Sequence, residues 1–110
     1  MGITKQSFGK SMDNQEVFLY GITNKNQMTI TVTDFGATLV EILVPDKNGN
    51  KIDVALGYDT VEGYYKNPGH FGAIIGRNGN RIKNAGFSID GKEYQLAVND
   101  NVNNLHSGPN

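Results

Sequence analysis

The chain has 110 residues, of which ten are Lys or Arg and eleven are Asp or Glu, so its formal net charge at neutral pH is -1. This length allows one domain at most, and the basic residues stand singly, so nothing favours nucleic acid or an anionic membrane as a partner. The absence of cysteine excludes disulfides and thiolate metal sites, and no apolar run approaches the length of a membrane span.

Turn-forming residues are unusually frequent along the whole chain. Glycine and asparagine each occur 14 times, and both tolerate left-handed backbone conformations. Short apolar stretches separate these turns, and no stretch sustains apolar residues at helical spacing. We therefore predict an all-β fold. Residues 1–11 carry lysines but no apolar core, so we expect no secretory signal and a soluble, cytoplasmic protein.

The first two strands are predicted in the N-terminal third of the chain. One is expected at Glu16–Ile22. In the next, Met28, Ile30 and Val32 alternate with three threonines, which is the period of two typical of a half-buried strand. We expect the apolar side of this alternation to face the core.

The stretch that follows predicts a pair of antiparallel strands. Thr38–Val44 has few polar residues, which suits a central strand covered on both faces, and Pro45 ends it because proline lacks a ladder donor. Asn48-Gly49 is a strong turn signal, so Lys51–Leu56 is expected to return antiparallel to the preceding strand. A single helical turn is expected next, over Asp59–Tyr65.

Two local features accompany that helical turn. Asp59 or Thr60 has a side chain able to cap its N-terminus. His70 lies between a glycine and a phenylalanine in an irregular stretch, and we expect it to be a packed aromatic residue. Two histidines 36 positions apart, without cysteine, do not indicate a zinc site.

A hairpin is predicted at residues 87–94, with Asp90-Gly91 as its two-residue turn. Because a hairpin returns its ends to the same place, Arg81 and His106 are expected to be neighbours although 25 positions separate them. The last ten residues, 101–110, consist of turn-forming and polar residues around one histidine, with no strand expected among them. A domain seldom stops inside such a loop, so we expect the chain to be truncated.

Polar groups around these two positions predict a binding site. A guanidinium, an imidazole and the amides of Asn80 and Asn104 suit a neutral ligand rich in hydroxyls. The nearby acids, Asp90, Glu93 and Asp100, form no convincing acid–base pair with His106 of the kind that glycoside hydrolysis needs. This segment is therefore expected to supply binding groups and no complete pair for proton transfer.

The glycine-rich run at Gly76–Arg81 has two competing interpretations. It could aim backbone N–H groups at a phosphate, but it lacks the Lys-Ser/Thr ending of a P-loop and a following helix. Alternatively, its glycines let the backbone pass close to another strand.

Several motifs in this order resemble those of the aldose 1-epimerase family, which includes the galactose mutarotases. The resemblance extends from about Phe8 onward, and its most specific pieces are Phe71–Arg77, Asn80-Arg81-Ile82 and Asn104-Leu105-His106. It implies a large antiparallel β-sandwich of which residues 1–110 are the N-terminal portion of a single domain. It also implies an isomerase that interconverts the α and β anomers of a free sugar, galactose or glucose, without a metal or cofactor.

The resemblance assigns roles to individual residues. Asn80, Arg81 and His106 match family positions that bind the sugar. The catalytic acid, a histidine, and the catalytic base, a glutamate, are expected after Asn110, so the segment alone is expected to be inactive. Two alternatives stay open: a non-catalytic carbohydrate-binding or regulatory module on the same fold, and a hexose-6-phosphate 1-epimerase, toward which Arg77 offers one cationic group.

Overall fold

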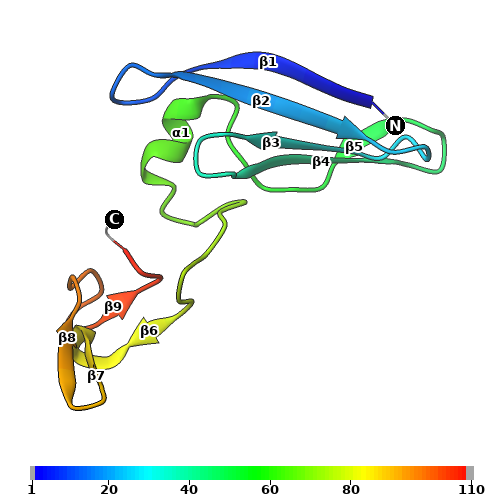
Figure 1. Cartoon of the computed structure of the whole chain (residues 1–110). Helices are drawn as coiled ribbons and strands as arrows, with labels where there is room; N and C mark the ends of the chain where they lie inside the picture. Colours follow the sequence, from blue (N-terminus) through cyan, green and yellow to red (C-terminus); the bar gives the residue numbers. More distant parts are fainter. Residues whose placement is uncertain (1, 109–110) are drawn as a thin grey trace. The chain divides into compact units, whose positions relative to one another are not determined.

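A computed structural model describes residues 2–108, and the chain divides into two units, the first ending at Ile74 and the second beginning at Ile75. Met1, Pro109 and Asn110 lie outside the described residues, and the end of the predicted 101–110 loop lies there with them. The first unit holds five strands and a helix (Figure 1): β1 Gly2–Lys10, β2 Glu16–Thr23, β3 Thr29–Thr33, β4 Leu39–Pro45, β5 Lys51–Asp53 and α1 Val61–Lys66.

The five strands form one antiparallel sheet in the order β1-β2-β3-β4-β5, so each strand pairs with the next along the chain. Strands β2 to β5 confirm the predicted strands. The sequence does not predict β1, because this edge strand is largely exposed and carries no alternation of apolar and polar residues. A strand paired along one edge only is specified less by its own pattern than by its partner.

The buried face of the sheet is the threonine face, which corrects the prediction for β3. Thr29, Thr31 and Thr33 are buried, whereas Ile30 and Val32 are half-buried. Thr33 lies directly opposite Leu19 of β2, a core residue, so the threonines share the core side. Their burial is possible because their hydroxyls have hydrogen-bond partners.

Two of these hydroxyls bond to side chains of neighbouring strands. The hydroxyls of Thr23 and Thr29 are 2.9 Å apart, and the hydroxyl of Thr31 donates to the Glu41 carboxylate at 2.8 Å. A buried hydroxyl with a partner avoids the desolvation penalty of an unpaired one. The alternation of apolar and polar residues therefore locates the strand correctly, but it does not show which side of the strand faces the core.

The opposite face of the sheet carries a row of four isoleucines. The register places Ile3 opposite Ile22, Ile22 opposite Ile30, and Ile30 opposite Ile42. These side chains are exposed or half-buried in the described chain. β4 is an interior strand, as predicted, but only its Val40 is buried, so the expectation that both its faces are covered is wrong for the described residues.

Val40 reaches the core because of an irregularity in the sheet. The pairing of β3 with β4 shifts between Thr31 and Val32, so that Val40 is the extra residue of a bulge. It packs with Leu19 and with Tyr64 of α1 in the buried cluster of this unit. The core of the first unit therefore lies between the threonine face of the sheet and α1.

Local side chains explain where two elements end. β5 ends at Asp53, three residues before the predicted Leu56, since the Asp53 carboxylate accepts the backbone N–H groups of Ile42 and Ala55, each at 3.0 Å. Thr60 occupies the N-cap of α1 as predicted, but its side chain makes no capping bond to the helix. Its hydroxyl bonds instead to Glu62, and this bond is the main reason that the pKa of Glu62 is lowered.

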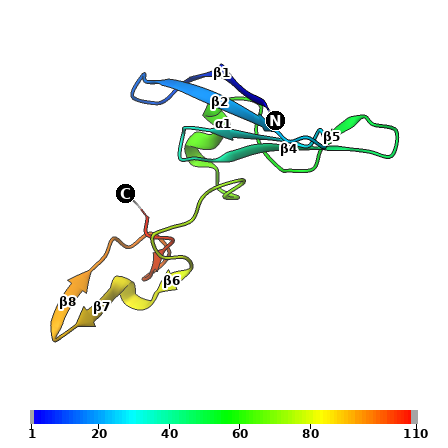
Figure 2. The same cartoon turned by 45° about the vertical axis from the view of Figure 1, so that its right-hand side comes forward.

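The second unit contains two small antiparallel pairs, and Figure 2 shows the hairpin that forms one of them. They are β6 Arg81–Ile82 with β9 Asn104–Leu105, and β7 Gly86–Ile89 with β8 Lys92–Gln95. The β7–β8 hairpin confirms the predicted Asp90-Gly91 turn, with Phe87 paired to Tyr94 and their rings stacked 5.3 Å apart. β9 corrects the expectation that residues 101–110 contain no strand.

Antiparallel strands thus dominate both units, which confirms the all-β prediction. The one α-helix found between residues 2 and 108 has six residues, and no helix there is long and apolar enough to cross a membrane. His70 is an exposed residue and not a buried one, and its backbone is left-handed with φ of 52°.

Candidate functional site

The two predicted binding segments lie side by side within the second unit. β6 pairs with β9 so that Arg81 faces Leu105 and Ile82 faces Asn104. The chain between them forms a 3₁₀ turn at Lys83–Ala85 and then the β7–β8 hairpin. The prediction that the segments of Arg81 and His106 are neighbours is therefore confirmed, although β6 and β9 form a pair of their own and do not extend the hairpin.

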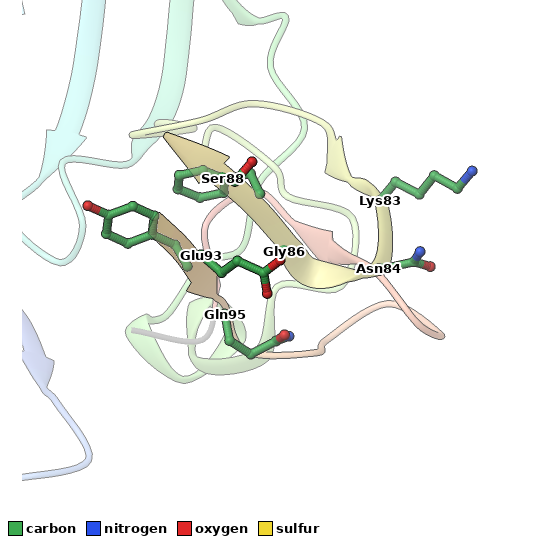
Figure 3. Close-up of a pocket in the computed structure, with 8 residues that line it drawn as sticks. Lys83, Asn84, Gly86, Ser88, Glu93 and Gln95 are labelled. Carbon is green, nitrogen blue, oxygen red and sulfur yellow. The ribbon is translucent and has the colours of Figure 1, made fainter. Parts of the chain in front are cut away.

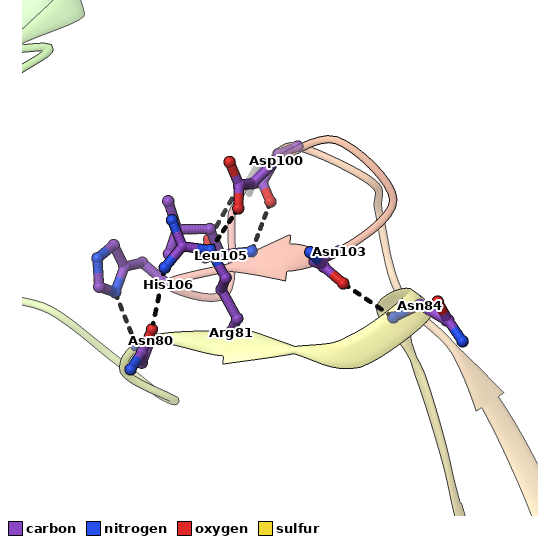
Figure 4. A network of polar contacts seen from close by, with 8 residues as sticks. Asn80, Arg81, Asn84, Asp100, Asn103, Leu105 and His106 are labelled. Carbon is purple, nitrogen blue, oxygen red and sulfur yellow. Dashed lines mark hydrogen bonds and ion pairs between the residues drawn. The ribbon is translucent and has the colours of Figure 1, made fainter.

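Asn80 contacts both of the other predicted sugar-binding residues, Arg81 and His106 (Figure 4). Its backbone N–H donates to Nδ1 of His106 at 3.0 Å, and its carbonyl accepts the backbone N–H of His106, also at 3.0 Å. Its side-chain oxygen accepts from Nη1 of Arg81 at 3.3 Å. The structure therefore brings a guanidinium and an imidazole onto one asparagine.

The bond from Asn80 determines which nitrogen of His106 carries the hydrogen. In a neutral imidazole one nitrogen donates and the other accepts. Since Nδ1 accepts from a backbone N–H, the hydrogen must be on Nε2. His106 is therefore a hydrogen-bond donor through Nε2, which suits an ether or hydroxyl oxygen as its partner.

The backbone at this point is held in an uncommon conformation. Asn80, His106 and Ser107 have φ values of 59°, 54° and 62°, in the left-handed region that non-glycine residues rarely adopt. His106 therefore lies outside the regular alternation of β9. Backbone strain of this kind persists where neighbouring contacts impose it, and it is concentrated at functional sites.

Arg81 has a second partner, which the sequence does not reveal. Its Nε lies 2.5 Å from Oδ2 of Asp100, with the arginine side chain 53% exposed and the aspartate side chain 24% exposed. From the sequence, Asp100 is a candidate only as an acid for His106. Asp100 is placed for this contact because it begins the Asp100–Asn103 turn. It also follows Asn99, whose side chain binds Leu105 of β9.

Asn104 is a buried residue that holds the backbone around the site in place. It is 3% exposed, and its side-chain amide donates to the carbonyls of Ala97 at 2.8 Å and Gly108 at 2.6 Å. A buried amide bonded in this way orders the loop and the end of the strand around β9. Asn104 also borders a cavity of about 260 Å³, together with Asn78, Gln95, Leu96, Ala97, Ser107 and Gly108.

A larger hollow of about 710 Å³ lies along the hairpin of the same unit (Figure 3). None of the predicted sugar-binding residues lines this hollow. The residues that line it are Lys83, Asn84, Gly86, Phe87, Ser88, Glu93, Tyr94 and Gln95. Size therefore does not identify the site here. Among the described residues there is also no group of three His, Cys, Asp or Glu side chains that could hold a metal ion.

Comparison with known proteins identifies relatives of this chain. A family model described as aldose 1-epimerase matches residues 19–110. Galactose mutarotase from Bos taurus is 42% identical over 83 residues, which cover 76% of this chain and 24% of that protein. Aldose 1-epimerase from Escherichia coli K12 is 36% identical over 97 residues, which cover 88% of this chain and 28% of that protein.

A solved structure has the same fold. The aldose epimerase homologue from C. elegans superimposes with a TM-score of 0.77 at 42% identity, covering 84% of this chain and 28% of that chain. The predicted fold class, all-β and like that of the galactose mutarotases, is confirmed by this likeness. The chain spans about a quarter of the length of the curated relatives that it matches.

Proposed function

This chain belongs to the aldose 1-epimerase family, and on that premise we propose that it forms the sugar-binding part of an enzyme that interconverts the α and β anomers of free hexoses. The observation that carries the proposal is the meeting of Arg81 and His106 at Asn80. A guanidinium and an imidazole meet there, and Asp100 balances the charge of the guanidinium, which suits a neutral ligand rich in oxygen.

The reaction requires two proton transfers. A base removes the proton of the anomeric hydroxyl, the bond between C1 and the ring oxygen breaks, and an acid delivers a proton to that oxygen. Rotation about C1–C2 and the reverse steps close the ring on the other face. We place the acid, a histidine, and the base, a glutamate, beyond Asn110, within the single β-sandwich domain whose N-terminal portion is residues 1–110.

The residues of this chain supply hydrogen bonds to that reaction. His106 donates Nε2–H to a sugar oxygen, and its orientation is set before the sugar arrives because Asn80 holds Nδ1. The outer N–H groups of Arg81 donate to further oxygens of the ring. Donors placed in advance stabilise charge that develops on the ring oxygen as its bond to C1 breaks.

A matched pair of variants tests the role of His106 in the complete protein. In His106→Asn the amide oxygen still reaches the Asn80 N–H, but the donor at the Nε2 position is lost. In His106→Gln the amide nitrogen lies near the Nε2 position. We expect polarimetry of fresh α-D-galactose and α-D-glucose to show turnover lowered about 10²–10³-fold in the Asn variant and less in the Gln variant.

The same assay separates the competing functions. Wild-type rates in both His106 variants and in Arg81→Ala would contradict a sugar-binding role for these residues. Sugar binding without any acceleration by the wild-type protein would indicate a non-catalytic module, and turnover of hexose 6-phosphates alone would indicate the phosphorylated substrate. Residues 1–110 alone are expected to leave the uncatalysed rate unchanged.

The preferred sugar and the location complete the proposal. Galactose or glucose is the proposed substrate, and the support for galactose is the name of the Bos taurus relative. The cytoplasm is the proposed location, which suits a chain without cysteine. Cell fractionation with an antibody against the chain tests the location.

A further inference from the structure

We propose that Asp100 is a positioning residue that orients Arg81 toward the sugar and makes the site select uncharged hexoses over phosphorylated ones. The inference rests on the proposed function of Arg81 and Asn80. Its basis is the contact of 2.5 Å between Nε of Arg81 and Oδ2 of Asp100. This contact lies on the inner edge of the guanidinium, next to the side-chain stem.

Two acceptors hold the guanidinium in place. Asp100 accepts from Nε, and the side-chain oxygen of Asn80 accepts from Nη1. These bonds use two of the five N–H donors of the arginine. Because a guanidinium is planar, two bonds to different nitrogens define its plane and aim the outer donors in a fixed direction.

The turn that carries Asp100 is itself tightly bonded. The backbone N–H of Asp100 donates to the carbonyl of Asn103 at 3.2 Å, and the N–H of Asn103 donates back to the carbonyl of Asp100 at 2.8 Å. The neighbouring Asn99 binds Leu105 at both ends, accepting its N–H at 2.6 Å and donating to its carbonyl at 2.8 Å. Leu105 is the strand partner of Arg81.

Backbone and side chain of Arg81 are therefore fixed by the same few residues. Asn99 fixes the strand opposite Arg81, and Asp100, next in sequence, fixes its guanidinium. An ion pair between exposed side chains generally contributes little to stability. The bonds from Asp100 and Asn80 nevertheless orient the guanidinium of Arg81, even where they add little to the free energy of unfolding.

The charge of Asp100 also shapes selectivity. Its carboxylate neutralises the cation of Arg81, so the pair offers directed N–H groups with no net charge to a ligand. A neutral hexose needs only those donors, whereas a phosphate group gains most from an uncompensated cation. The same pair therefore favours the free sugar and disfavours an anion beside Arg81.

The test compares Asp100→Asn with Asp90→Asn in the complete protein. Both variants remove one negative charge from the second unit, but Asp90 lies in the hairpin turn, where asparagine suits its φ of 51°. We expect Asp100→Asn to raise KM for free hexose about tenfold and to make galactose 6-phosphate a several-fold stronger inhibitor. Asp90→Asn is expected to change neither value.

Each outcome decides a separate question. If Arg81→Ala weakens hexose binding while Asp100→Asn behaves like Asp90→Asn, the positioning role is wrong and the proposed function stands. If Arg81→Ala leaves hexose binding unchanged in calorimetric titration, the proposed function itself fails. A change in thermal stability of Asp100→Asn without a change in KM or in phosphate inhibition would make Asp100 a purely structural residue.

A measurement on the wild-type protein needs no variant. The Arg81 Nε–H resonance in NMR spectra is expected to be shifted downfield by the carboxylate, and addition of free hexose should move the outer N–H resonances and leave this one in place. A hexose-induced loss of the Nε–H signal would show that the sugar displaces Asp100, which would overturn the inference.

Discussion

The two units of this chain are stabilised in different ways. The first unit packs Leu19, Val40 and Tyr64 into an apolar cluster between a sheet and a helix. In the second unit, Ala85 and Asn104 are the buried residues among those described, and asparagine side chains bind the loops to one another. One unit is held by burial of apolar surface, and the other by hydrogen bonds between side chains and backbone.

This difference suits the proposed placement of the sugar-binding residues in the second unit. Apolar packing has no preferred direction, whereas a hydrogen bond specifies both a distance and an angle. Asn80 fixes the ring of His106 and Asn99 fixes the partner of Arg81 by such bonds. A site that reads the positions of hydroxyl groups needs this directional framework more than it needs a large core.

The largest expected effect is steric and belongs to the first unit. At Gly72, with φ of +62°, an added Cβ would lie 1.8 Å from the carbonyl oxygen of Leu39. We expect Gly72→Ala to lower the free energy of unfolding of the complete protein by roughly 3–5 kcal/mol, measured by urea denaturation. Gly49→Ala is the matched control: its φ is +85°, but its Cβ would meet nothing within 4 Å, so only about 1 kcal/mol is expected. Equal losses in the two variants would contradict the steric argument.

Removal of the Asn104 amide tests the hydrogen-bonded framework of the second unit. Asn104→Ala leaves the carbonyls of Ala97 and Gly108 without their donor, and we expect a loss of about 2–4 kcal/mol. Asn103→Ala removes one bond, to the N–H of Asn84, and should cost about 1 kcal/mol. Hydrogen exchange should accelerate at Leu105 and not in β2 or β3. Faster exchange in both units would show that they unfold together.

The smallest effect concerns a polar turn in the first unit. Hydrogen bonds lower the pKa of Asp46 below 3.8, chiefly the bond from the backbone N–H of Asn50, with a further contribution from that of Asn48. A lowered pKa stabilises the folded turn above pH 3.8, and this stabilisation is lost as the pH falls through the pKa of the folded state. NMR titration of the Asp46 carboxyl should give a midpoint below 3.8, with faster exchange of the Asn50 amide in acid. A midpoint at or above 3.8 would show that the turn is not held by this carboxylate.

Local sequence patterns predicted most of the strands and the hairpin correctly. The Asp90-Gly91 turn specifies its hairpin because both residues adopt positive φ, at 51° and 76°. Prediction failed where the cause lies outside the element. β1 is an edge strand with little apolar content, and β9 has only two residues, so each is recognised by its partner strand and not by its own residues.

The sequence by itself determined that the chain is all-β, where its main turns lie, and that Asn80, Arg81 and His106 occupy adjacent segments, because turn chemistry and period-two patterns are local. Tertiary structure decided which face of β3 is buried, since period two is symmetric until a helix covers one side. It also decided the hydrogen position on His106 and the pairing of Arg81 with Asp100. These contacts span 26 and 19 positions, and they form only when folded loops bring particular atoms within hydrogen-bond distance.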